Sequence, residues 1–193
     1  ATGSAPAVPN RPPLAQAESM TAAYHGALRN AGIEAHQLGA MDLYSCFPIA
    51  VWCAMDALGV TLDDPRPLTL TGGLSFFGGP GNNYSTHGIA EMVHWLRARS
   101  EPSYGLVGAN GGYLSKHAVG VYANVSSPFP EPVSEPGPAT PVETIEKPAG
   151  PGRIESYTVQ QQGDKTRAIV VGRQLSDERR WVGVADPEDD ALL

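Results

Sequence analysis

Residues 72–87 read GGLSFFGGPGNNYSTH, a glycine-rich stretch in which large apolar side chains stand between the glycines. These side chains predict an ordered turn and not a flexible linker. The extended run Pro67–Thr71 predicts a strand before it, and a helical pattern follows at Ile89, Met92, Val93 and Leu96. Glycines allow the backbone to approach a ligand or another strand closely, and a helix start supplies N–H groups that can hold an anion or an oxyanion. The stretch therefore predicts a strand, a glycine turn and a helix at a ligand site.

The composition describes a globular protein with many turns. Of 193 residues, 41% are hydrophobic and only 17% are charged, with 22 Gly and 18 Pro, which is too apolar for a disordered chain. The net charge is −7 and the basic residues form no cluster, which argues against nucleic acid as a partner. No apolar run approaches the roughly 18 residues of a membrane span.

The chain start and the cysteines bear on processing and location. Residues 1–13 lack both an initiator Met and the apolar core of a signal peptide, so we expect an internal segment or a processed end. Cys46 and Cys53 lie seven residues apart in a helical pattern, about 10 Å along a helix axis and too far for a disulfide. Reduced thiols and a cytoplasmic location follow as the expectation.

Residues 1–127 predict a layered α/β domain with a mixed sheet. Helices and strands alternate along it in the order αβαβαββ. The predicted elements are a helix over 14–31, a strand over 41–45, a helix from Pro48, a helix over 85–99 and strands over 104–110 and 117–124.

A proline-rich break divides the chain in two. Residues 128–151 contain eight prolines and predict an extended linker without a packed element. Residues 152–193 then show only strand patterns, over 153–161, 166–175 and 179–185, which predict a small β-meander.

Two side chains near helix starts are candidates for chemistry. Cys46 precedes the helix that begins at Pro48, and a helix N-terminus favours the thiolate; the alternative is a small apolar residue packed under the turn. His87 lies on the first turn of the helix after the glycines. It is either a general acid or base, or a residue bonded to local backbone.

His117 ends the loop 111–116 between two predicted strands. This loop contains Gly, Tyr and Lys, which favours the edge of a site over a solvated hairpin tip. The other histidines, His25, His36 and His94, are expected at the surface or bonded locally. Neither histidine nor carboxylate spacing predicts a metal site.

Three motifs occur in a familiar order: residues 42–47 (DLYSCF), 72–83 (GGLSFFGGPGNN) and 108–112 (GANGG). They resemble the three active-site loops in the C-terminal half of thiolase-superfamily enzymes, and most of all those of actinobacterial thiolase-like proteins known as acetyl-CoA acetyltransferases. Residues 152–159 and 168–173 resemble the extra C-terminal domain of those proteins. The resemblance implies a layered αβα half with a mixed five-element sheet pattern, followed by a small all-β, OB-like domain.

The chain departs from the family pattern in each loop. Tyr44 stands where the family has Asn, or His in the sterol-carrier type, at the position that helps bind the substrate carbonyl through water. Gly79 stands where the family has the His of the oxyanion hole, and Asn110 where it has the Cys that serves as acid and base. Glycine carries no proton and an amide is no base near neutral pH, so thiolytic chemistry is not expected.

The resemblance implies a set of site residues and partners. The catalytic candidates are Tyr44, Asn110 and His117, and the substrate-binding candidates are Cys46, Gly78, Gly79, Pro80, Asn82, His87, Gly111 and Gly112. No cofactor is implied beyond a CoA thioester as substrate or ligand. In the family the nucleophilic Cys belongs to the N-terminal half, and one half alone exposes a large apolar surface. We therefore expect that half as a separate or cleaved chain, with a homo-oligomer as a further option.

Three functions fit these observations. The first is an acyl-CoA-processing subunit, either an acyltransferase or a tyrosine-dependent retro-aldolase of lipid or steroid side-chain metabolism. The second is a non-catalytic subunit that binds CoA esters or acts as a scaffold, which the glycine and asparagine replacements favour over a true thiolase. The third is a protein-docking role for the β tail.

Overall fold

The computed structural model describes residues 1–126, 140–163 and 165–185, and these divide into two compact units. The α/β unit contains residues 1–5 and those from 16 onward up to the proline-rich break. The β unit contains residues 6–15 together with those from 140 onward. Sequence-based boundaries included residues 6–15 in the first domain, whereas the structure groups them with the β unit, to which they are hydrogen bonded.

Within residues 1–126 a four-stranded mixed sheet forms the centre of the α/β unit, as predicted, in the order β1-β4-β3-β2. Strands β2 and β3 are parallel, and the other two pairs are antiparallel. The strands are β1 (Thr2–Ser4), β2 (Leu38–Asp42), β3 (Tyr104–Gly111) and β4 (Lys116–Ala123). The three residues of β1 carry no strand pattern and were not predicted.

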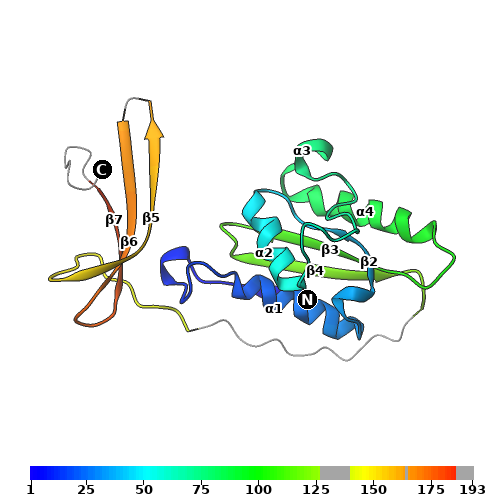
Figure 1. Cartoon of the computed structure of the whole chain (residues 1–193), viewed down its shortest axis with the longest axis horizontal. Coiled ribbons are helices and arrows are strands. Elements are labelled where there is room, and N and C mark those ends of the chain that lie inside the picture. The colour runs from blue at the N-terminus through cyan, green and yellow to red at the C-terminus, as the bar shows by residue number, and fades with distance from the viewer. Residues whose placement is uncertain (127–139, 164, 186–193) are drawn as a thin grey trace. The chain divides into compact units, whose positions relative to one another are not determined.

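Helices cover both faces of this sheet (Figure 1). Alternate side chains of β3 enter two cores: Leu106 packs with α1 and α2, and Val107 packs with Met92 and Leu96 of α4. The helices are α1 (Glu18–Ala31), α2 (Pro48–Leu58) and α4 (Tyr84–Arg97). The predicted αβα layering is therefore confirmed for this unit. No described helix is long and apolar enough to cross a membrane.

The first two helices end as their sequences suggest. Gly32 and Gly59 follow α1 and α2 with φ near 66° and 64°, a left-handed conformation that glycine adopts at little cost. Helix α2 begins with Pro48 in its first turn, where a missing N–H costs nothing. Helix α1 begins at Glu18 and not at residue 14, because residues 14 and 15 belong to the β unit.

The predicted strand Pro67–Thr71 is wrong, and the sheet accordingly lacks it. The backbone N–H groups of Leu70 and Thr71 donate to the carboxylate of Asp42 and not to a neighbouring strand. A short helix, α3 (Leu74–Phe77), follows inside the glycine stretch, so the predicted direct passage from strand through turn to helix is also wrong.

The β unit is built on an antiparallel meander, side by side in the order β5-β6-β7 (Figure 1). Its strands β5 (Gly152–Gln162), β6 (Lys165–Gln174) and β7 (Arg180–Val184) confirm the three predicted strand patterns. Tight turns separate them, at Gly163 with φ near 62° and around Asp177.

Part of the predicted linker is packed. Residues 127–139 lie outside the described residues. Beyond them, Ile145 N–H donates to the carbonyl of Arg180, and Arg180 N–H donates to that of Glu143, at 2.8 and 2.9 Å. The expectation that no element of 128–151 packs is therefore wrong for residues 143–145, because the outer edge of β7 offers them backbone partners.

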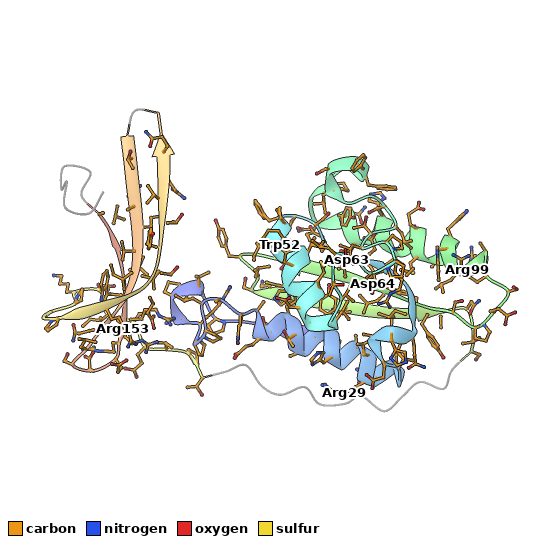
Figure 2. The ribbon with its side chains drawn as sticks, in the orientation of Figure 1. Arg29, Trp52, Asp63, Asp64, Arg99 and Arg153 are labelled. Atoms are coloured by element: carbon orange, nitrogen blue, oxygen red, sulfur yellow. The ribbon has the colours of Figure 1, made fainter. Side chains whose placement is uncertain are left out.

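Arg66 connects the loop after α2 to the start of β2. Its Nη1 donates to the carbonyls of Ala35 and Leu38 at 2.7 and 2.9 Å, and its Nε and Nη2 donate to the carboxylate of Asp64, which is labelled in Figure 2. Hydrogen bonds from the Arg66 side chain and backbone lower the pKa of Asp64 to about 2.

We expect an NMR pH titration of the Asp64 carboxyl carbon to give a pKa of about 2. Because this pKa lies below the unfolded value of about 3.9, the pair stabilises the fold above that pH and loses its contribution as pH falls toward 2. Arg66→Met should return the pKa of Asp64 to its ordinary range, whereas Arg97→Met should leave it unchanged. An Asp64 that titrates normally in the wild type contradicts the assignment.

Candidate functional site

The site begins at Asp42, the last residue of β2, whose carboxylate is fully buried. Its Oδ2 accepts hydrogen bonds from Leu70 N–H, Thr71 N–H and Thr71 Oγ1 at 2.8, 3.0 and 3.1 Å. Its Oδ1 accepts one from the Tyr84 hydroxyl at 3.2 Å. A buried carboxylate needs such partners. Asp42 thereby fastens the entry of the glycine stretch and the first residue of α4 to the end of β2.

Two glycines allow close packing around Asp42 and its neighbour Tyr24. A Cβ at Gly88 of α4 would lie 2.9 Å from Asp42 Oδ1. A Cβ at Gly108 of β3 would lie 2.2 Å from the hydroxyl of Tyr24, whose pKa is raised by burial and by the charge of Asp42. A larger residue at Gly88 would push α4 away from Asp42, and one at Gly108 would push β3 away from Tyr24 of α1.

The glycine stretch contacts the first loop directly. Leu74 N–H donates to Ser45 Oγ at 3.0 Å, and a Cβ at Gly73 would lie 2.6 Å from the same oxygen. Gly72, Gly73 and Gly78 all have φ between 82° and 88°. Gly73 therefore allows a close backbone approach, but its partner is a side chain of the loop that carries Tyr44 and Cys46 and not the ligand or strand that was predicted.

Tyr44 lies between the first loop and the start of α4. Its ring packs edge-on against that of Tyr84, with 5.3 Å between centroids. Burial, and then the nearby Cys46, raises the pKa of Tyr44. Tyr44 is therefore a protonated hydrogen-bond donor at neutral pH and not a ready base.

The third loop meets the first through Asn110, near the end of β3. Asn110 Nδ2 donates to Cys46 Sγ at 3.3 Å, and its buried Oδ1 has no hydrogen-bond partner within the described residues. Asn110 is directly opposite His117 in the β3–β4 register, and such side chains lie about 5 Å apart on one face. His117 is only 4% exposed, so a solvated hairpin tip is excluded for it.

The remaining candidates occupy more open positions. His87 packs its ring against Phe77 of α3, with 5.1 Å between centroids. Gly112 is in the β3–β4 turn with φ near 60°, and Gly111 pairs with Lys116. The exposed members are Gly78, Gly79, Pro80, Asn82 and Gly112. The structure thus brings Tyr44, Cys46, Asn110 and His117 together, and leaves the 78–82 segment exposed between anchored ends at Leu74 and Tyr84.

Sequence reasoning missed the residues that join the first loop to the glycine stretch. Asp42, Ser45, Thr71 and Tyr84 were not singled out. A signal existed for Asp42, because it is an acidic residue that ends an otherwise uncharged strand segment and precedes a candidate loop. Thr71 looked like an ordinary member of a strand, and Tyr84 like one of the apolar side chains of the glycine turn. Their role depends on tertiary proximity, with 2.5 Å between Thr71 Oγ1 and the Tyr84 hydroxyl.

The chemistry available is hydrogen-bond donation next to a thiol. Tyr44 and Asn110 supply donors, and Cys46 supplies a free thiol one residue before the N-cap of α2. No group of three or more His, Cys, Asp or Glu among the described residues is placed to hold a metal ion.

A difference titration tests the state of Tyr44. The ultraviolet absorbance of tyrosinate is followed against pH in the wild type and in Tyr44→Phe, and the second curve is subtracted from the first. We expect the difference to show one group that ionises above pH 10, because burial raises the pKa of Tyr44. The exposed Tyr113, replaced in the same way, serves as the comparison. A Tyr44 that ionises near or below pH 9 would instead make it a competent base.

Comparisons with known proteins show the family of this chain. A family model described as "Thiolase-like protein type 1 additional C-terminal domain" matches residues 129–193. A solved structure, described as a monomeric SCP2-thiolase like protein type 1 from Mycobacterium smegmatis, is 40% identical with a TM-score of 0.87. The similarity covers 100% of this chain and 43% of that one. No protein in the curated set matches. As its three loops predicted, the chain belongs to the thiolase-like proteins that carry the additional C-terminal domain.

Proposed function

We propose that this chain provides an acyl-CoA-binding site in a thiolase-like protein that does not perform thiolysis. The observation that carries the proposal is the group formed by Tyr44, Cys46, Asn110 and His117, in which Asn110 Nδ2 lies 3.3 Å from Cys46 Sγ. Two donors, the Tyr44 hydroxyl and the Asn110 amide, stand near one thiol. Such donors suit the carbonyl oxygen of a thioester.

The missing proton carriers support binding without thiolysis. Gly79 has no side chain to activate a nucleophile, and Asn110 accepts no proton near neutral pH. The raised pKa of Tyr44 adds to this, since a protonated phenol does not abstract a proton from an acyl-CoA.

A second candidate is a retro-aldolase that acts on a CoA ester of lipid or steroid side-chain metabolism. The protonated Tyr44 favours it in one respect, because a phenol can donate a proton to the enolate that carbon–carbon cleavage releases. In this mechanism His117, opposite Asn110, would serve as the base.

We further propose that the remaining portion of a thiolase-like protein packs on α2. Phe47, Ile49 and Trp52 are 68%, 50% and 55% exposed, although α2 is apolar on most of its surface (Trp52 is labelled in Figure 2). A helix that is apolar all round is typical of a helix buried on all sides. The chain spans 43% of its solved relative, and the rest of such a protein is the partner that we assign to this face. A homo-oligomer is the alternative occupant.

The proposal also includes the architecture of the β unit and the location of the protein in the cell. The meander β5-β6-β7 is a component of OB-like barrels, and we propose that architecture for the β unit. A cytoplasmic location is supported by the two free cysteines.

Calorimetry and turnover assays on one preparation test the proposal. The chain is assembled with the N-terminal portion of a thiolase-like protein and titrated with acetyl-CoA, followed by assays for thiolysis and for aldol cleavage. We expect saturable binding that Asn110→Leu weakens about tenfold or more, whereas the exposed Asn124→Leu does not weaken it. Thiolysis would overturn the proposal, and aldol cleavage would select the second candidate. Absence of binding in a folded complex would reject both.

A further inference from the structure

Arg180, the first residue of β7, is a buried cation in the β unit. It is only 1% exposed, the largest of the fully buried side chains. Burying a guanidinium costs several kcal/mol unless its N–H groups are satisfied. Most of the groups that satisfy it come from a distant part of the chain.

Residues 9–12 supply three of these acceptors. Arg180 Nη1 donates to the carbonyls of Pro9 and Arg11, and Nη2 donates to that of Pro12 at 3.1 Å. Its Nε donates to Glu155 Oε2 at 2.6 Å. Without residues 9–12 the buried guanidinium would keep Glu155 as its one acceptor among these four.

Glu155 is directed to this position by a break in strand register. The β5–β6 pairing shifts between Ile154 and Ser156, so Glu155 is the extra residue of a bulge. Arg173 and Arg180 face each other across β6 and β7, and like charges in that position repel. Glu155 accepts from Arg173 Nε at 2.8 Å as well as from Arg180, so its single negative charge lies between the two cations and offsets part of their repulsion.

A second contact joins the same segment to the β unit. Asn10 and Val142 exchange two hydrogen bonds: Val142 N–H donates to the Asn10 carbonyl at 2.8 Å, and Asn10 Nδ2 donates to the Val142 carbonyl at 2.9 Å. Residues 6–15 contain Pro6, Pro9, Pro12 and Pro13. A proline-rich segment offers carbonyl acceptors and few N–H donors, which suits a guanidinium as its partner.

We propose that the β unit carries a binding site for a proline-rich segment, built around Arg180, and that residues 6–15, which include the 3-10 turn Val8–Asn10, occupy this site in cis. The β unit is then incomplete when defined by residues 129–193 or 152–193 alone. The contacts that form the site lie wholly within the β unit. Its ligand class is a short peptide with a Pro-x-x-Pro spacing like that of Pro9–Pro12.

The occupied site also ties the chain start to the candidate site through chain continuity. The segment follows β1 directly, and β1 pairs Gly3 with His117 of β4. Ala5 N–H donates to the carbonyl of Ser115 at 2.9 Å. Release of residues 6–15 is therefore expected to increase hydrogen exchange at β1, next to His117.

Hydrogen exchange on the full chain tests the proposal. In Arg180→Met we expect the amides of residues 7–11 and 142–145 to exchange about 100-fold faster than in the wild type, because a buried charge network is broken. Arg179→Met is the matched control, since Arg179 pairs with Asp177 and not with the segment. Equal exchange of residues 7–11 in the two variants would overturn the proposal.

A segment replacement keeps the test decisive if Arg180→Met unfolds the β unit. Residues 6–13 are exchanged for a Gly-Ser sequence of equal length, and the peptide APAVPNRPPL is added in trans. Saturable restoration of protection at residues 142–145 and around Glu155 supports the site. A β unit that is equally protected without the segment, or a peptide that restores nothing, rejects it. A peptide with Asn10 and Arg11 retained and its prolines changed to alanine should bind about tenfold more weakly.

Discussion

Replacing Asp42 with alanine is expected to destabilise the α/β unit by roughly 3–5 kcal/mol. The carboxylate is fully buried and accepts from the backbone of Leu70 and Thr71 and from the hydroxyls of Thr71 and Tyr84. Alanine leaves the N–H groups of Leu70 and Thr71 without this acceptor, whereas the hydroxyls of Thr71 and Tyr84 keep each other as partners. Each donor left without an acceptor costs about 1–3 kcal/mol, and the loss of the carboxylate's other hydrogen bonds adds to this. Urea unfolding followed by circular dichroism measures the change in the free energy of unfolding.

Two further variants serve as a control and as an intermediate case. Asp56→Ala removes an exposed carboxylate from α2 and should change the free energy of unfolding by no more than about 0.5 kcal/mol. Asp42→Asn keeps one acceptor oxygen and should fall between the two. If Asp42→Ala is as stable as Asp56→Ala, Asp42 does not hold the glycine stretch and α4 to the end of β2.

Replacing Trp52 with alanine is expected to weaken assembly with the remaining thiolase portion by about 30-fold or more. Trp52 is 55% exposed on α2, next to other exposed apolar residues, and buried tryptophans at interfaces contribute about 2 kcal/mol or more. The stability of the isolated chain should change little, because the side chain is largely in solvent there. Biolayer interferometry of the chain against the N-terminal portion gives the dissociation constant.

Leu62→Ala is the matched control, since Leu62 is 76% exposed but lies beyond the end of α2. Its dissociation constant should equal that of the wild type. Equal affinities for all three proteins would remove α2 from the interface. A chain that is a stable, well-folded monomer and binds no N-terminal portion would reject the assembly itself.

Much of the fold followed from local patterns. Helix α2 and strands β3 to β7 carry apolar periodicity and turn residues that match their structure, and Pro48, Gly32 and Gly59 mark helix ends. Strand β1 carries no such pattern, because three residues held by backbone bonds to β4 need no particular side chains. Residues 67–71 have the alternating apolar pattern of a strand, but the N–H groups of Leu70 and Thr71 donate to the Asp42 side chain. Strand propensity does not predict whether a backbone group bonds to a strand or to a side chain.

In the candidate site, too, local sequence predicted some features, and contacts between distant residues determine the others. Motif order identified the three loops, and the structure shows a contact between Cys46 and Asn110 of the first and third. The residues that join the first loop to the glycine stretch, Asp42, Thr71 and Tyr84, escaped because their partners are up to 42 positions away. The contact between Arg180 and Pro9 spans 171 positions, beyond the reach of any local pattern.

The central claim is that the three loops form one acyl-CoA site. Hydrogen exchange of the assembled protein, with and without saturating acetyl-CoA, tests this claim most directly. With acetyl-CoA bound, we predict slower exchange in the loop of Tyr44 and Cys46, in the glycine stretch 72–83 and near Asn110 and His117. All three regions should become protected over the same range of acetyl-CoA concentration. Protection confined to the β unit, or no protection at saturation, would contradict it.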